Sequence, residues 1–118
     1  MVLGRQAVRR LAQEQGFSLI DQTKLVTAAS ELARNALTHG GGGTLKWEIL
    51  VDGIRRGVRL TFEDQGPGIP NVELAMTDGW TSGSGLGLGL TGARRLVNEF
   101  KLNSTVGVGT RVIVTRWK

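Results

Sequence analysis

Two glycine-rich stretches, Asp64-Gln65-Gly66-Pro67-Gly68 and Gly85-Leu86-Gly87-Leu88-Gly89, indicate the fold of this chain. The first follows a segment of alternating apolar residues and begins with an acid, and the second leads into a segment with helical periodicity. Residues 65–85 are expected to form a long loop, with at most a short helix near 71–77. Loops of this length in a compact domain are usually functional lids or disordered segments.

Two helices are predicted before these stretches. The first covers residues 4–15. The second is capped by Ser18 or Asp21 and runs to about Thr38, because the glycines of 40–43 cannot sustain a helix cheaply. Its apolar stripe has the spacing of a helix that packs on a core and consists of Leu25, Ala28, Ala29, Leu32 and Ala36.

Alternating residues predict a β-hairpin between the second helix and the first glycine-rich stretch. One strand is expected over residues 44–52 and the next over 58–64, with a turn from Asp52-Gly53 to about Gly57. The residues that share one face of the first strand are Leu45, Trp47, Ile49 and Val51. The inward face of the second strand is expected to carry Val58, Leu60 and Phe62.

The remaining elements are a helix at about 88–99 and two strands at about 100–106 and 110–117. This order predicts an α+β fold, a two-layer α/β sandwich with a mostly antiparallel sheet and helices on one face. A chain of 118 residues is expected to form a single domain over 1–118.

Composition narrows the class of protein further. The net charge is +5, but the cations are scattered and the few aromatic residues are not interleaved with them, which argues against a nucleic-acid surface. No stretch approaches the ~20 apolar residues of a membrane span, and no secretion signal opens the chain. The chain has no cysteine, so it has neither disulfides nor a thiolate metal site. We expect a cytoplasmic protein.

Glu31 and Asn35 lie four residues apart on the second helix, so their side chains are expected on one helix face. A solvated helix flank would explain either residue taken alone. The pair also has a chemical use, because an asparagine oxygen is a suitable ligand for Mg²⁺ and a glutamate can accept a proton from an attacking hydroxyl or water.

Asp64 is an even-numbered residue of its strand, as are the residues expected to face inward, so its side chain is expected on the same face. An ionised carboxylate on a covered face is costly unless it is paired or hydrogen-bonded. The exocyclic amine of adenine could supply that hydrogen bond, and a turn-capping aspartate at a strand end is the alternative. Gly66 and Gly68 fit both interpretations, since either allows close backbone approach or positive φ.

The second stretch continues as Gly87-Leu88-Gly89-Leu90-Thr91-Gly92, which matches G-x-G-x-x-G. We reject a dinucleotide fold, because a long loop precedes the motif and no acid follows Glu99. Backbone N–H groups of a glycine loop at a helix N-terminus still favour phosphate, and a flexible linker is the alternative. His39, the only histidine, supports neither a metal site nor a catalytic triad and is assigned a structural or capping role.

Four motifs together resemble the GHKL (Bergerat-fold) ATP-binding superfamily of gyrase, Hsp90, histidine kinases and anti-sigma kinases. Residues 30–36 (SELARNA) resemble its N box, 64–70 (DQGPGIP) its G1 box, 85–90 (GLGLGL) its G2 box and 107–110 (GVGT) its later G-x-G-T element. Each motif is weak by itself, but the four span nearly the whole chain in the right order. Within the superfamily, the chain most resembles the RsbT-like switch serine/threonine kinases of the bacterial stressosome, in the anti-sigma regulatory factor family.

This resemblance implies that the protein uses ATP and Mg²⁺. Asn35 would ligate Mg²⁺ and Glu31 would be the general base. Asp64 would hold the adenine amine with Thr110 nearby, and residues 71–84 would form the lid over ATP. The other ATP-binding residues that the resemblance implies are Gly66, Gly68, Thr81, Ser82, Gly83, Gly85, Leu86, Gly87, Leu88 and Gly89, of which the glycines from 85 to 89 would line the triphosphate.

The implied activity is phosphorylation of a serine or threonine on a STAS-domain protein, which is a stressosome scaffold or an antagonist of an anti-sigma factor. A downstream phosphatase or sigma regulator is a further candidate partner. A nucleotide-dependent module that sequesters a sigma factor or another regulator is the alternative, because anti-sigma kinases share all four motifs. Relatives usually have a strand before the first helix, whereas only Met1-Val2-Leu3 precede it here. Either the first strand is lost or the sequence is trimmed, and a sheet edge open for pairing with a partner or another copy would follow.

Overall fold

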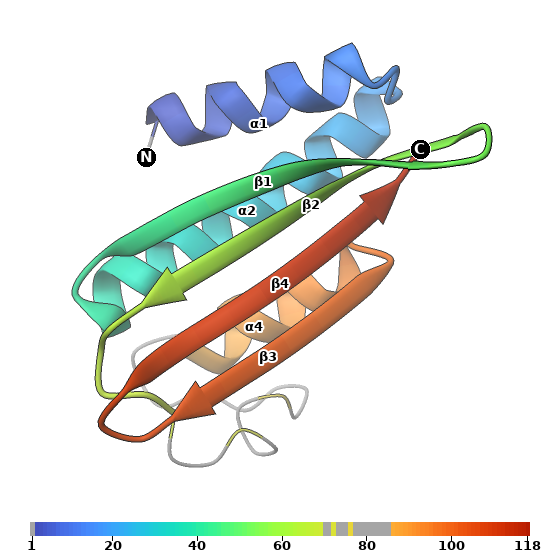
Figure 1. Cartoon of the computed structure of the whole chain (residues 1–118). Helices are drawn as coiled ribbons and strands as arrows, with labels where there is room; N and C mark the ends of the chain where they lie inside the picture. The colour runs from blue at the N-terminus through green and yellow to red at the C-terminus, as the bar shows by residue number, and fades with distance from the viewer. Residues whose placement is uncertain (1, 70–71, 73–75, 77–85) are drawn as a thin grey trace.

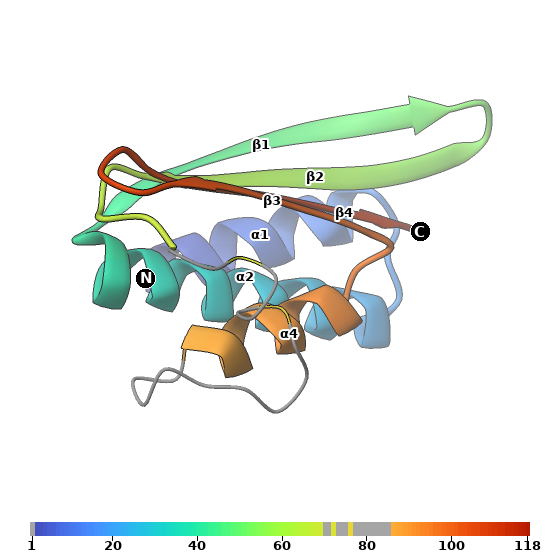
Figure 2. The same ribbon diagram turned by 90° about the horizontal axis from the view of Figure 1, so that it is seen from below.

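The computed structural model describes residues 2–69, 72, 76 and 86–118, except for the side chains of 2–4, 38–40 and 86–89. The elements are α1 (Val2–Glu14), α2 (Leu19–Gly40), β1 (Gly43–Asp52), β2 (Arg55–Asp64), α4 (Leu86–Arg95), β3 (Glu99–Thr105) and β4 (Gly109–Trp117). The four strands form an antiparallel sheet in the order β1-β2-β4-β3 (Figure 1). The described helices α1, α2 and α4 lie on one face of this sheet (Figure 2), which confirms the predicted two-layer α+β sandwich. No helix among the described residues is long and apolar enough to cross a membrane.

The long helix α2 carries the candidate residues and is held at both ends. Ser18 is its N-cap, because its hydroxyl oxygen accepts a hydrogen bond of 3.1 Å from the N–H of Asp21. Gly41, with φ of 74°, ends the helix in the left-handed conformation that glycine adopts at little cost. Of the two caps that the sequence offered, Ser18 is therefore the one used, and the helix extends to Gly40.

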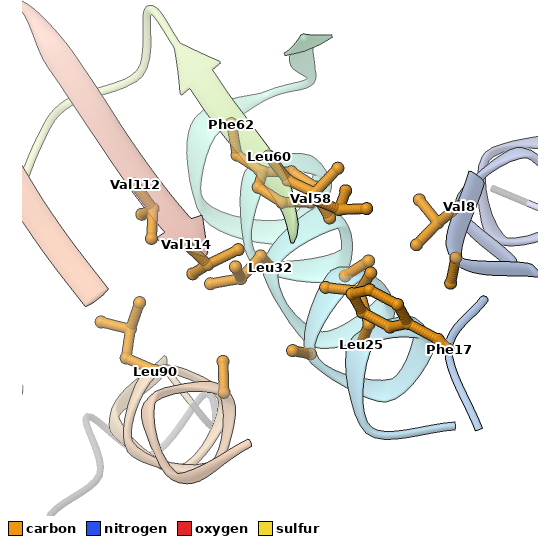
Figure 3. Close-up of a cluster of buried hydrophobic side chains, with 14 of the residues drawn as sticks. Val8, Phe17, Leu25, Leu32, Val58, Leu60, Phe62, Leu90, Val112 and Val114 are labelled. Atoms are coloured by element: carbon orange, nitrogen blue, oxygen red, sulfur yellow. The ribbon is translucent and has the colours of Figure 1, made fainter. Parts of the chain in front are cut away.

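The core lies between α2, the other helices and the central strands (Figure 3). Its largest fully buried apolar side chains are Val8, Leu25, Leu32, Val58, Leu60, Leu90 and Val114. The inward face predicted for β2 is confirmed, since Val58, Leu60 and Phe62 are all buried. The corresponding face of β1 is different. Trp47, Ile49 and Val51 are 53%, 39% and 60% exposed, because β1 is an edge strand whose far end extends beyond the helices (Figure 2).

The turn between β1 and β2 is tighter than predicted. Asp52 pairs directly with Arg55, so the turn contains only Gly53 and Ile54, and β2 begins at Arg55 rather than at residue 58. Gly53 has φ of 63°, which is the conformation that a type II′ turn requires at its first central position.

Helix α4 begins and ends earlier than predicted. It begins at Leu86, whereas the sequence predicted a start at about residue 88. Its end at Arg95 is followed by a tight turn in which the N–H of Leu96 donates to the carbonyl of Ala93 at 3.1 Å. Leu96 and Val97 still pack on the core although they lie beyond the helix. Their apolar side chains continue the helical spacing, and this spacing led to a predicted helix end that is too late. The short helix predicted near 71–77 lies mostly outside the described residues.

An ion pair joins the start of α2 to the end of β4. The guanidinium of Arg116 donates to the carboxylate of Asp21 at 2.6 Å and to the carbonyl of Leu96 at 2.9 Å. The hydrogen bond from Arg116 is the main reason why the pKa of the Asp21 carboxyl lies below its ordinary value. The contact closes the end of the sandwich opposite to the glycine motifs.

Asp21→Asn is expected to destabilise the chain at neutral pH but not at strongly acidic pH. Because the folded pKa of Asp21 is lowered, its contribution is fully present above the unfolded pKa of about 3.9 and is lost as the pH falls through the folded value. The pair is partly exposed, so we expect about 1 kcal/mol at pH 7. Urea unfolding of both proteins at pH 7 and near pH 2 measures this, and an equal difference at both pH values would contradict it.

Candidate functional site

Asn35 and Asp64 meet in a hollow of about 170 Å³, here named the Asp64 hollow, between α2 and the end of β2. Whole-ligand pockets usually measure about 300–1,000 Å³, so this hollow can hold only one part of a larger ligand. Its walls are mostly apolar with a few polar groups, as suits a flat ring with a polar edge. The lining residues are Leu32, Asn35, Ala36, Phe62, Asp64, Pro67, Gly68, Ile69, Leu90, Thr110 and Val112.

Asp64 is anchored through one of its carboxylate oxygens. Oδ1 accepts a hydrogen bond of 2.9 Å from the N–H of Gly66, which is the turn-capping contact that the sequence offered as an alternative. The other oxygen makes no hydrogen bond within the described residues and remains able to accept one from a ligand. The two interpretations of Asp64 are thus compatible, because one oxygen serves each.

Asn35 contributes a buried polar group that lacks a partner. Its Nδ2 atom is fully buried and makes no hydrogen bond in the described part of the chain. Buried polar groups are nearly always paired, so an unpaired one beside a hollow points to a ligand. The side-chain oxygen of Asn35 also fits the predicted Mg²⁺ role, because Mg²⁺ prefers hard oxygen donors. Among the described residues, no group of three or more His, Cys, Asp or Glu is placed to hold a metal ion.

Ser104 supports the far wall of the hollow and was missed by sequence reasoning. Its hydroxyl accepts a hydrogen bond of 2.7 Å from the N–H of Ile69 and lies 2.8 Å from the hydroxyl of Thr110. Thr110 pairs with Ser104 on one side and with Asp64 on the other in the sheet register. The alternation of Leu102 and Ser104 on β3 was the available signal, since it places the serine on the inward face.

Gly68 holds the loop after β2 against the turn between β3 and β4. It has φ of 79°, and a Cβ atom there would lie 2.5 Å from the carbonyl oxygen of Thr105. The N–H of Gly107 donates to the carbonyl of Pro67 at 2.9 Å in the same contact. Both properties foreseen for this glycine, positive φ and close backbone approach, are therefore present.

Gly68→Ala is expected to lower the free energy of unfolding by about 2 kcal/mol more than Gly107→Ala. Both glycines have positive φ, which by itself costs about 1–2 kcal/mol for alanine, but only at Gly68 would the new methyl group meet backbone atoms. Chemical denaturation of the two variants makes the comparison directly. Equal destabilisation would show that the loop can move away from Thr105 freely.

Glu31 opens into a different cavity, a groove of about 480 Å³ that we name the Glu31 groove. It lies between α1, α2 and the start of β1, and Ala36 and Phe62 form a wall that it shares with the Asp64 hollow. The carboxylate of Glu31 is paired with the guanidinium of Arg34. Glu31 and Asn35 therefore belong to adjacent cavities rather than to one.

Several predicted site residues lie outside the described residues or are described only by their backbone. Thr81, Ser82, Gly83 and Gly85 lie outside the described residues, as does most of the predicted lid 71–84. Leu86, Gly87, Leu88 and Gly89 form the first turn of α4 and are described only by their backbone. Their predicted contacts with a triphosphate remain predictions, and so does the capping role of His39, whose side chain is not described.

Comparison with known proteins identifies the family. Residues 20–118 match the model of the histidine kinase-, DNA gyrase B-, and HSP90-like ATPases. The chain is 44% identical to the serine/threonine-protein kinase RsbT of Bacillus subtilis (strain 168), over 99% of this chain and 88% of that protein. It is 31% identical to the anti-sigma F factor of Clostridium novyi (strain NT), over 95% of this chain and 82% of the relative. The resemblance predicted from the four motifs is thus confirmed, and the chain belongs to the family of histidine kinase-, DNA gyrase B-, and HSP90-like ATPases.

Proposed function

We propose that this protein is a Mg-ATP-dependent serine/threonine kinase that phosphorylates a STAS-domain regulator in a bacterial stress or sigma-factor signalling pathway. The observation that carries the proposal is the meeting of Asn35 and Asp64 in one hollow, with Glu31 in the adjacent groove. The similarity to a relative named as a serine/threonine-protein kinase supports the reaction type.

ATP binding is assigned to the Asp64 hollow. The adenine ring lies between its apolar walls and donates its exocyclic amine to the free oxygen of Asp64. Asn35 would hold Mg²⁺ through its side-chain oxygen. Bound Mg²⁺ would neutralise part of the negative charge of the phosphates. The backbone N–H groups at the start of α4 are assigned to the phosphates, because an N-terminal helix end favours anions.

Phosphoryl transfer is assigned to the boundary between the two cavities. Glu31 accepts the proton of the substrate hydroxyl as the hydroxyl oxygen attacks the γ-phosphorus of ATP. The bond between the γ-phosphorus and the β,γ-bridging oxygen breaks, and ADP leaves. Because Glu31 and Asn35 are one helical turn apart, the base and the nucleotide are held at a fixed relative position.

A second function, nucleotide-dependent sequestration of a sigma factor or another regulator, is favoured by one observation. Relatives named as anti-sigma F factors match most of the chain, including one from Clostridium acetobutylicum that is 33% identical over 82% of this chain and 69% of its own length. Sequestration needs a stable complex, whereas a kinase needs only a transient one.

One experiment separates the two functions. The protein is incubated with γ-labelled Mg-ATP and a panel of purified STAS domains, and phosphoserine or phosphothreonine is read by mass spectrometry. Glu31→Gln protein serves as the control. The kinase proposal predicts transfer to at least one STAS domain by the wild type and transfer slowed by about 100-fold or more in Glu31→Gln. ATP binding without transfer, together with capture of a sigma factor in a pull-down, would instead establish sequestration.

A further inference from the structure

A row of three polar side chains crosses the sheet at the Asp64 hollow, on the adjacent strands β2, β4 and β3 (Figure 1). In the sheet register Asp64 pairs with Thr110, and Thr110 pairs with Ser104. Side chains that lie directly opposite each other in an antiparallel sheet point to the same face. Asp64 and Thr110 line the hollow, whereas Ser104 lies behind Thr110 and does not line it. Ser104 can therefore act on a bound base through Thr110 without touching the base.

The hydroxyl of Ser104 takes part in three hydrogen bonds. It accepts from the N–H of Ile69 at 2.7 Å, lies 2.8 Å from the hydroxyl of Thr110 and donates to the carbonyl of Gly109 at 3.2 Å. A hydroxyl has one proton and two lone pairs. If Ser104 donates to Gly109, its second lone pair accepts the proton of Thr110. All three protons then have acceptors within the protein, and Thr110 presents a lone pair to the hollow.

The same two hydroxyls allow a second arrangement. The 3.2 Å contact between Ser104 and Gly109 is longer than the usual range of about 2.5–3.0 Å for an O–H···O hydrogen bond, so it is the weakest of the three. If that contact is given up, Ser104 donates to Thr110, and Thr110 turns its own proton toward the hollow. The hydrogen bonds from Ile69 to Ser104 and on to Thr110 then run in one direction, in which each strengthens the next. Thr110 can thus face a ligand as an acceptor or as a donor.

Purine bases differ in the groups that they would present to Asp64 and Thr110. Adenine has an exocyclic amine, which is a donor, next to the ring nitrogen N1, which is an acceptor. Hypoxanthine has the reverse pattern, with a carbonyl oxygen in place of the amine and an N1–H donor. The hollow of about 170 Å³ holds only part of a nucleotide, so the side of the base away from the sugar, which carries N1, enters it. With the amine on the free oxygen of Asp64, N1 lies toward Thr110, which is the neighbour of Asp64 in the register.

We propose that Ser104 is a positioning residue for base recognition. Its hydroxyl accepts the proton of Thr110 when the base presents a donor, and it donates its own proton to Thr110 when the base presents an acceptor. Thr110 therefore accommodates both kinds of purine, and the discrimination between adenine and 6-oxopurines depends on the free oxygen of Asp64 alone. This proposal rests on the nucleotide binding in the proposed function.

Asp64→Asn is the background in which the role of Ser104 is best measured, because it should reverse the preference for the base. The oxygen of the new amide keeps the N–H of Gly66, so the amide nitrogen faces the base and donates to the carbonyl oxygen of hypoxanthine. Thr110 accepts the N1–H of hypoxanthine, while its own proton goes to Ser104. Calorimetric titration should show that Asp64→Asn binds Mg-ITP about tenfold more tightly than Mg-ATP, whereas the wild type prefers Mg-ATP.

Ser104→Val and Ser104→Thr form a matched pair, since the two new side chains have the same shape and only threonine retains a hydroxyl. Combined with Asp64→Asn, Ser104→Val should weaken the binding of Mg-ITP about tenfold more than that of Mg-ATP. The reason is that N1–H leaves the proton of Thr110 without an acceptor, whereas N1 of adenine accepts it. Ser104→Thr should keep the preference for ITP. Asn103→Ala, at an exposed neighbouring position on β3, is the control and should change neither affinity.

A purely structural role for Ser104 would change both affinities together. Equal weakening of ITP and ATP by Ser104→Val, in protein that thermal unfolding shows to be folded, therefore overturns the proposal, and so does an Asp64→Asn variant that does not prefer ITP. The ratio can also be measured without Asp64→Asn, since Ser104→Val alone should raise the preference for ATP over ITP about tenfold. If the wild type fails to bind ATP, the proposed function itself fails. If the wild type binds ATP but the two ratios do not change, only the inference about Ser104 fails.

Discussion

Glu31→Gln is expected to slow phosphoryl transfer by about 100-fold or more while leaving ATP affinity nearly unchanged. The amide of glutamine keeps the size of the side chain and can still accept a hydrogen bond from Arg34, but it cannot take up the proton of the substrate hydroxyl. Glu31 lines the groove rather than the Asp64 hollow, so its replacement should not disturb the nucleotide. Single-turnover transfer rates and calorimetric ATP affinities measure the two quantities.

Glu48→Gln is the matched control for this experiment. Glu48 is an exposed glutamate on β1 that lines neither cavity, so its replacement should change neither rate nor affinity. Equal turnover of Glu31→Gln and wild type would refute the assignment of Glu31 as the base. A large loss of ATP affinity in Glu31→Gln would instead show that the two cavities act as one site.

Asp64→Asn is expected to weaken ATP binding by roughly 10–100-fold, which corresponds to about 1.5–3 kcal/mol for a hydrogen bond to a charged group. The N–H of Gly66 would retain the amide oxygen of the new asparagine as its acceptor. The amide nitrogen would then face the exocyclic amine of adenine, and two donors would oppose each other. Calorimetric titration with Mg-ATP measures the loss.

Asp52→Asn provides the comparison for this variant, because Asp52 is an exposed aspartate at the end of β1 far along the hairpin from Asp64. Thermal unfolding of both variants establishes that they remain folded. Unchanged ATP affinity in folded Asp64→Asn would remove the carboxylate from the adenine site and leave it with the turn contact to Gly66 alone.

Much of the fold could be predicted because its elements carry strong local signals. The alternation in β2 specified which side chains are buried, and Val58, Leu60 and Phe62 are indeed in the core. The ends of helices and strands were less predictable, because tertiary contacts rather than the periodicity of apolar residues determine where an element ends. After Arg95 the apolar residues continue at helical spacing, yet the N–H of Asn98 already donates to the carbonyl of Thr115 at 2.9 Å and binds the chain to the sheet.

The candidate site was predictable only in part. The sequence motifs predicted Asn35 and Asp64 as site residues, and both line the same hollow in the structure. The separation of Glu31 from them depends on where α1 and β1 lie relative to α2, which helical spacing cannot reveal. Ser104 acts through pairing with Thr110 across two strands, and such a contact requires the register of the sheet. The pairing of Arg34 with Glu31 is different, because it is an i,i+3 contact within α2 that helical spacing alone allows.

A crystal structure of the protein with Mg²⁺ and a non-hydrolysable ATP analogue tests the central claim most directly. We predict the adenine ring between Leu32, Phe62 and Leu90, with its amine within hydrogen-bond distance of Asp64 and the metal ion on the side-chain oxygen of Asn35. A nucleotide bound elsewhere on the molecule, or one bound with Asp64 and Asn35 out of contact, would contradict the account.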